Sequence, residues 1–154
     1  MTPKDLLDHA ERLCRLSPKR PRQVDLRRAV SAAYYAVFHD LCHVCANTLI
    51  GTGAATATDT WTLAYRAVNH GPAKQRCKAP SIAGFPSEIR NYAGAFVTLQ
   101  EERHRADYDP RARFSRSQAL QLVGQARRAV AAMRETPLKE RLAFAAYVLL
   151  PPRS

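Results

Sequence analysis

Acidic residues are scarce in this chain. It holds 13 Asp and Glu against 24 Lys and Arg, so the formal net charge is +11 at pH 7. This imbalance disfavours acidic partners and allows nucleic acid or another anionic surface. Lysine is also scarce, since 19 of the 24 basic side chains are arginine, whose planar guanidinium suits two-point contact with phosphate. Codon bias is an alternative source of an arginine- and alanine-rich composition.

Long apolar runs are lacking as well. The longest strongly apolar stretch, Leu142–Leu150, is far shorter than the roughly 20 residues with which a helix crosses a bilayer. The N-terminus leads straight into an amphipathic segment, without the apolar stretch of a secretory signal. We therefore expect a soluble, cytoplasmic protein without membrane contact. In that compartment the four cysteines are expected to be free thiols.

No segment shows the two-residue alternation of a strand, and no internal repeat is present. Apolar residues instead recur at spacings of three and four, which predicts helices. The fold class is therefore all-α, and we expect an up-down four-helix bundle forming one domain over residues 1–154. The four main helices are predicted at residues 3–16, 25–49, 86–108 and 115–133, the second of them central.

The connections carry weaker patterns. Residues 51–58 are rich in small side chains and predict a loop, and a short extra helix is expected over residues 60–69. Residues 71–85 have no period and predict irregular structure. A C-terminal helix is expected over residues 138–150, and it either covers the bundle or packs between subunits. Its apolar residues on one side are Leu138, Leu142, Ala145 and Leu149.

Two basic runs flank the first and last connections of the predicted bundle. Helices of alternating direction place both connections at the same end, where a polyanion gains most from counterion release. A solvated charged face is the alternative interpretation. The candidate nucleic-acid-binding residues in these runs are Arg27, Arg28, Arg105, Arg111 and Arg113.

Two segments carry a family resemblance. Residues 28–39 read Arg-Ala-Val-Ser-Ala-Ala-Tyr-Tyr-Ala-Val-Phe-His, and residues 103–108 read Arg-His-Arg-Ala-Asp-Tyr. Together they resemble the HEPN superfamily of small helical bundles, in its bacterial branch with Ala-Tyr-Tyr-Ala-x-Phe-His and Arg-x-x-Ala-Asp-Tyr motifs. The resemblance follows the helix order over roughly residues 3–135. It places Tyr34, Tyr35 and His39 in a motif without an assigned role.

The resemblance implies a homodimer that interacts with RNA or nucleotides. Such proteins are often encoded beside a minimal nucleotidyltransferase, and several relatives are metal-independent endoribonuclease toxins or act in phage defence. A component of a toxin-antitoxin or defence pair is therefore the implied function, without a cofactor or a metal.

The ribonuclease motif departs from the family pattern in one position. Active relatives have Arg, a polar residue and, several residues later, His; here Arg103 and His104 match, but Tyr108 stands in the place of the closing His. A tyrosine with a pKa near 10 is a poor base, whereas histidine is suited to proton transfer. We expect Arg103 and Tyr108 to face one spot and His104 to point elsewhere, because successive helical residues lie about 100° apart.

The candidate catalytic residues are therefore Arg103, His104 and Tyr108. The alternative is a non-catalytic dimeric protein-interaction module whose ribonuclease motif has decayed.

Zinc binding by the second helix is a third interpretation. His39, Cys42, His43 and Cys45 place several donors on adjacent turns. One helix rarely supplies a closed tetrahedral site, however, so the cysteines are better explained as small buried residues. We expect no metal.

Overall fold

The chain folds into helices and short connections. A computed structural model describes residues 1–153, none of which lies in a strand. The α-helices are α1 (Pro3–Arg15), α2 (Gln23–Leu49), α3 (Asp59–Arg66), α4 (His70–Lys78), α5 (Ser87–Tyr108), α6 (Arg116–Glu135) and α7 (Leu138–Leu149). Two 3-10 helices, Gly53–Ala57 and Pro80–Gly84, lie in the connections. The all-α class predicted from the sequence is confirmed.

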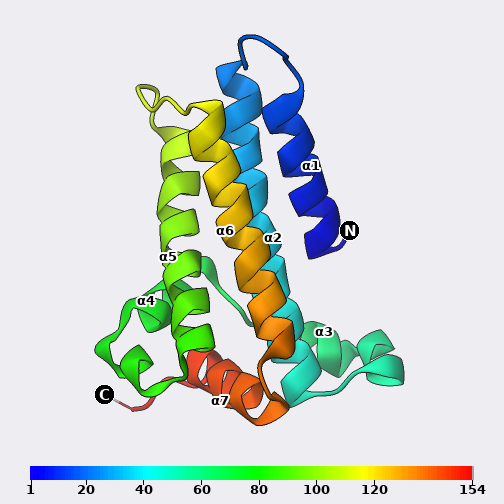
Figure 1. The fold of residues 1–154 in the computed structure, drawn as a ribbon. Helices are drawn as coiled ribbons and strands as arrows, with labels where there is room; N and C mark the ends of the chain where they lie inside the picture. The colour runs from blue at the N-terminus through cyan, green and yellow to red at the C-terminus, as the bar shows by residue number, and fades with distance from the viewer. Residues whose placement is uncertain (154) are drawn as a thin grey trace.

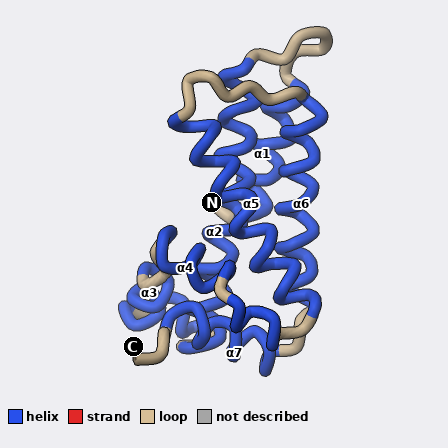
Figure 2. Tube along the Cα trace, turned by 90° about the vertical axis from the view of Figure 1, so that its left-hand side faces the viewer, coloured by secondary structure: helices blue, strands red, loops and turns tan. Residues whose placement is uncertain are grey.

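Helix α2 is the centre of the arrangement. It has 27 residues and contacts α1, α3, α5, α6 and α7, as its wide apolar stripe predicts. Helices α1, α2, α5 and α6 lie along one another, while α3, α4 and α7 gather at the opposite end from the α1–α2 connection (Figures 1 and 2). One continuous buried cluster joins α1, α2, α4, α5, α6 and α7.

Side-chain caps explain where two of the bundle helices begin. At α1 the Thr2 hydroxyl accepts from the Asp5 N–H at 3.1 Å, and the Thr2 N–H donates to the Asp5 carboxylate at 2.8 Å. Ser115 and Gln118 repeat this reciprocal pair at α6, with distances of 3.0 and 2.8 Å. Such capping boxes satisfy two backbone donors that the first turn leaves free.

The prediction of irregular structure for residues 71–85 is wrong over most of its length. Helix α4 occupies residues 70–78, and the 3-10 helix Pro80–Gly84 follows it. Pro72 lies in the first turn of α4, where a missing N–H costs no helical hydrogen bond. Ala73 and Cys77, four residues apart, are buried and hold α4 on the bundle. Residues 51–58, predicted as a loop, contain the other 3-10 turn.

The apolar side predicted for the C-terminal helix covers the bundle only in part. Leu138 is 60% and Leu142 41% exposed, whereas α7 buries Phe144, Ala145 and Val148. The rotation follows from Phe144, whose ring packs edge-on against Tyr92 and Phe85, so aromatic packing outweighs the leucine stripe. Within residues 1–153, no helix has the length and apolar character needed to cross a membrane.

Candidate functional site at the basic end

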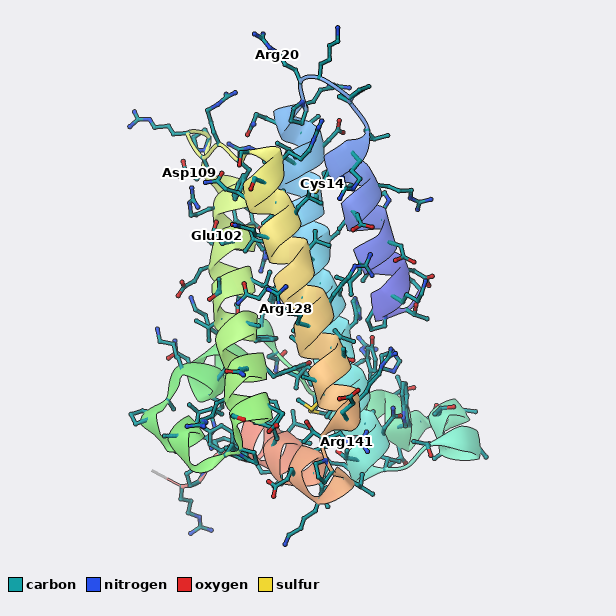
Figure 3. The ribbon with its side chains drawn as sticks, viewed as in Figure 1. Cys14, Arg20, Glu102, Asp109, Arg128 and Arg141 are labelled. Atoms are coloured by element: carbon teal, nitrogen blue, oxygen red, sulfur yellow. The ribbon has the colours of Figure 1, made fainter. Side chains whose placement is uncertain are left out.

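The α1–α2 and α5–α6 connections lie at the same end of the bundle (Figure 1). Arg20 on the first connection and Asp109 on the second mark this end in Figure 3. We call residues 16–22 and 109–115, with the helix ends that they join, the basic end. The two basic runs seen in the sequence therefore come together in space, as the alternating helix directions predict.

A groove opens at the basic end between α1, α2 and the end of α5. Its volume is about 1010 Å³, and its wall carries both cationic and aromatic side chains. Aromatic rings beside cations suit a nucleic-acid strand, because cations contact phosphates while rings stack on bases. The polar and aromatic residues that line it include His9, Gln23, Arg27, Arg28, Ser31, Tyr35, Asp107, Tyr108 and Arg113.

Arg27 holds the α5–α6 connection in place. Its Nη1 donates to the carbonyls of Ala106 and Asp109, each at 2.9 Å, and its Nη2 donates to the carbonyl of Ala112. Gln23, one turn earlier, exchanges two hydrogen bonds with the Phe114 backbone at 2.8 and 2.9 Å. Both side chains thus bond to carbonyls that lie beyond the end of α5. Three donors of the Arg27 guanidinium are therefore used by the fold.

Three of the other candidate arginines are free of carboxylates. Arg28, Arg111 and Arg113 are exposed, and no acidic oxygen of residues 1–153 lies within 4.0 Å of their guanidinium nitrogens. Arg105 differs, because its Nη1 pairs with Glu102 at 2.6 Å and its guanidinium lies over the Phe114 ring. The free positive charge of the predicted set therefore concentrates on Arg28, Arg111 and Arg113.

Arg103 brings the two family-like motifs together. Its guanidinium carbon lies 5.1 Å from the ring centre of Tyr34 and 5.6 Å from that of Tyr35. The side chain is 11% exposed, its Nε is buried without a hydrogen-bond partner, and its Nη1 is 3.7 Å from Asp107. A guanidinium so buried and so weakly bonded has donor capacity left for an anion.

His70 is a site residue that the sequence did not indicate. As the first residue of α4, it places its Nδ1 2.5 Å from the Tyr34 hydroxyl, and its ring stacks on Phe38 with centres 3.8 Å apart. Burial and, after it, the positive charge of Arg103 lower the pKa of His70 below its ordinary value. Burial is also the main cause that raises the pKa of Tyr34, so Tyr34 remains a neutral phenol.

His104 and Tyr108 lie together and apart from this cluster. Their ring centres are 4.9 Å apart, and Tyr108 is 65% exposed. The expectation that Tyr108 shares a face with Arg103 is wrong: Arg103 pairs with Asp107 and Tyr108 with His104, because neighbours on one helix face are four residues apart rather than five.

His39, the last member of the Tyr-Tyr motif, bonds elsewhere. Its Nδ1 lies 2.5 Å from the Tyr65 hydroxyl of α3, and burial lowers the pKa of the imidazole. Trp61 and Tyr65 stack beside it, with ring centres 5.3 Å apart. The structure therefore joins Tyr34 and Tyr35 to Arg103, whereas His39 contacts α3.

The cysteines of α2 lie in the core. Cys14, Cys42, Cys45 and Cys77 are all buried free thiols, and burial raises the pKa of Cys42 and of Cys45 to about 12. Over residues 1–153, no three His, Cys, Asp or Glu side chains come together as a metal site requires. Cys42 and Cys45 are small side chains packed in the core, as predicted from the sequence.

Comparison of the chain with protein-family models, with curated proteins and with solved structures gave no significant match. What the basic end can bind is therefore inferred from its own side chains. A groove lined by Arg28 and Arg113, with the nearly buried Arg103 guanidinium against its wall residues Tyr35 and Asp107, can bind phosphate.

Proposed function

We propose that this chain is an RNA-binding, HEPN-like up-down four-helix bundle that binds RNA phosphates in the groove of the basic end. The observation that carries the proposal is the set of exposed arginines without carboxylate partners, Arg28, Arg111 and Arg113, at or beside that groove. When such arginines bind the phosphates of a strand, they release the counterions condensed on it, which supplies affinity without base specificity. Contact between Arg103 and the Tyr34–Tyr35 pair supports the family resemblance.

A homodimer belongs to the same proposal, together with a role beside a minimal nucleotidyltransferase in a toxin-antitoxin or defence pair. A dimer presents two basic ends to one strand, which increases avidity when their separation allows both to bind. Sedimentation of the purified chain measures the oligomeric state, and a monomer at the concentrations that bind RNA contradicts this part of the proposal.

The salt dependence of RNA binding tests the proposed function. We expect the affinity for a fluorescent single-stranded RNA to fall steeply with salt, and Arg28→Ala with Arg113→Ala to reduce the logarithmic slope by about 1.4. The matched control removes two exposed arginines at the other end, Arg66 and Arg90. Equal slopes in the two double variants contradict binding at the basic end, and absence of salt-dependent binding overturns the proposed function.

A protein-interaction module is the second candidate function. Apolar side chains lie exposed at the basic end: Leu16 is 60%, Val24 44% and Tyr108 65% exposed. Such residues suit the desolvated centre of a protein interface better than a phosphate contact. This candidate predicts a dimer that persists after Arg28→Ala with Arg113→Ala, is lost in Tyr108→Ser, and binds no RNA at physiological salt.

A further inference from the structure

A second pocket lies away from the basic end. Its volume is about 300 Å³, and it opens between the start of α1, the C-terminal half of α2, the end of α6 and the start of α7. Arg141, near the start of α7, marks this part of the bundle in Figure 3, at the opposite end from Arg20. The pocket shares no lining residue with the groove of the basic end, and its volume suits one small molecule rather than a strand. We call it the α7 pocket.

Two arginines line the α7 pocket without carboxylate partners. No acidic oxygen of residues 1–153 lies within 4.0 Å of the guanidinium nitrogens of Arg134 or Arg141. The Nε of Arg141 is buried and has no hydrogen-bond partner. A buried charged donor without an acceptor costs free energy, which two-point bonding to a carboxylate offsets. These two arginines therefore have donors available to an anionic ligand.

Asp40 lines the same pocket with the opposite charge. It is 6% exposed, and its Oδ2 accepts from the Tyr92 hydroxyl at 2.9 Å. Its Oδ1 has no hydrogen bond within the described residues and is not sealed in the core, so this oxygen is open to the pocket. Burial raises the pKa of Asp40 to about 6, against the lowering effects of the Tyr92 bond and of the Arg134 charge. Asp40 is therefore mostly ionised at pH 7, and its free oxygen needs a donor such as an ammonium group.

The remaining polar side chains of the α7 pocket add no charge at pH 7. Burial is the main cause that lowers the pKa of His43, so its ring is neutral. Asn47 uses its Oδ1 to accept from the Trp61 indole at 3.0 Å, which leaves the N–H groups of its amide for a ligand. Two positive charges and one negative charge thus face the pocket. A small molecule with two carboxylates and one ammonium group complements them.

We propose that the α7 pocket binds an acidic α-amino acid, aspartate or glutamate, with its carboxylates on Arg134 and Arg141 and its ammonium on Asp40. This site is independent of RNA binding, because its residues lie outside the basic end. The ligand contacts α2, α6 and α7 at once, so binding should also raise the melting temperature of the protein.

Calorimetric titration at pH 7 tests the class of ligand. The probes are L-aspartate and L-glutamate, and the matched compounds are succinate and glutarate, which keep both carboxylates but lack the ammonium. We expect at least one of the amino acids to bind, and its matched dicarboxylate to bind at least about tenfold more weakly, because Asp40 then has no donor. Inorganic phosphate, which lacks both the second carboxylate and the ammonium, should also bind more weakly.

Substitutions test the assigned contacts, and circular dichroism checks that each variant is folded. Arg141→Met keeps much of the aliphatic stem and should weaken amino-acid binding at least about tenfold. Arg66→Met, at an exposed arginine of α3 outside the pocket, is the matched control and should leave the affinity unchanged. Asp40→Asn retains an acceptor for the Tyr92 hydroxyl but adds an amide donor. It should therefore weaken binding of the amino acid and not that of the dicarboxylate.

Three results overturn this assignment. They are absence of binding by both amino acids, a dicarboxylate or phosphate that binds as tightly as the amino acid, and an affinity for the amino acid that Arg141→Met leaves unchanged. Each of them leaves the proposed function intact, because the salt dependence of RNA binding is measured separately.

Discussion

Arg27 and Arg103 use the same side chain in two neighbouring regions of the bundle in opposite ways. Arg27 of α2 donates to three backbone carbonyls at and beyond the end of α5. Arg103, on α5 itself, has a longer ion pair with Asp107 and a buried Nε without a partner. The first guanidinium is held by the fold, whereas the second has few partners within it. A cluster of arginines is therefore informative about function only after the partners of each have been identified.

Removing the Arg27 donors is expected to have the largest effect on stability. Arg27→Met keeps much of the aliphatic stem but leaves three carbonyls without their charged donor, so the free energy of unfolding should fall by about 3 kcal/mol. Urea denaturation followed by circular dichroism measures it. Arg28→Met, an exposed neighbour without carboxylate partners, is the control and should change stability by less than about 0.5 kcal/mol. Similar losses in both variants contradict the structural role of Arg27.

The corresponding change at Arg103 should either leave the free energy of unfolding unchanged or increase it slightly. Replacing a buried, weakly paired charge by an apolar side chain of similar length is often neutral or stabilising, so Arg103→Met should raise the free energy of unfolding by zero to about 1 kcal/mol. The same denaturation experiment measures it. A loss as large as that of Arg27→Met means that Arg103 is also a structural residue, and the contrast between the two regions then fails.

The titration of His70 is expected to have the smallest effect on the free energy of unfolding. Folded His70 has a lowered pKa, so the unfolded chain binds this proton more readily and the free energy of unfolding decreases as pH falls below 6.5. In Arg103→Met the pKa of His70 should rise towards 6.5 without reaching it, because burial, the larger cause, remains. NMR titration of the imidazole follows this shift. An unchanged pKa means that the Arg103 charge does not act on His70.

Local sequence signals predicted the bundle helices because each signal acts over a few residues. The Ser115 capping box and the apolar stripe of α2 are read from spacings of three and four, and the structure has both. The meeting of the two basic runs needed only the number and direction of the helices. The apolar spacing of α7 did not show which of its sides packs on the bundle, because Phe144 packs against Tyr92 and Phe85, which lie far from it in the sequence.

The position of His70 was not predictable in the same way. Gly71 and Pro72 predict a break in helical structure where α4 begins, although the spacing of Ala73 and Cys77 is a weak helical signal. The proximity of His70 to Arg103 depends on how α4 packs against α5, which no local pattern records. The different use of Arg27 and Arg103 likewise depends on where the α5–α6 connection turns its carbonyls.

The reactivity of the four buried thiols measures how often the helices that carry them leave the bundle. Cys14 belongs to α1, Cys42 and Cys45 to α2, and Cys77 to α4, and burial raises the pKa of Cys77 to about 12. Alkylation requires the thiolate, so a reagent reacts only after the surrounding helix has opened. Cys45 should react only on global unfolding, because α2 contacts five other helices. The labelling rate of Cys77 then measures how often α4, and with it His70, moves away from Arg103.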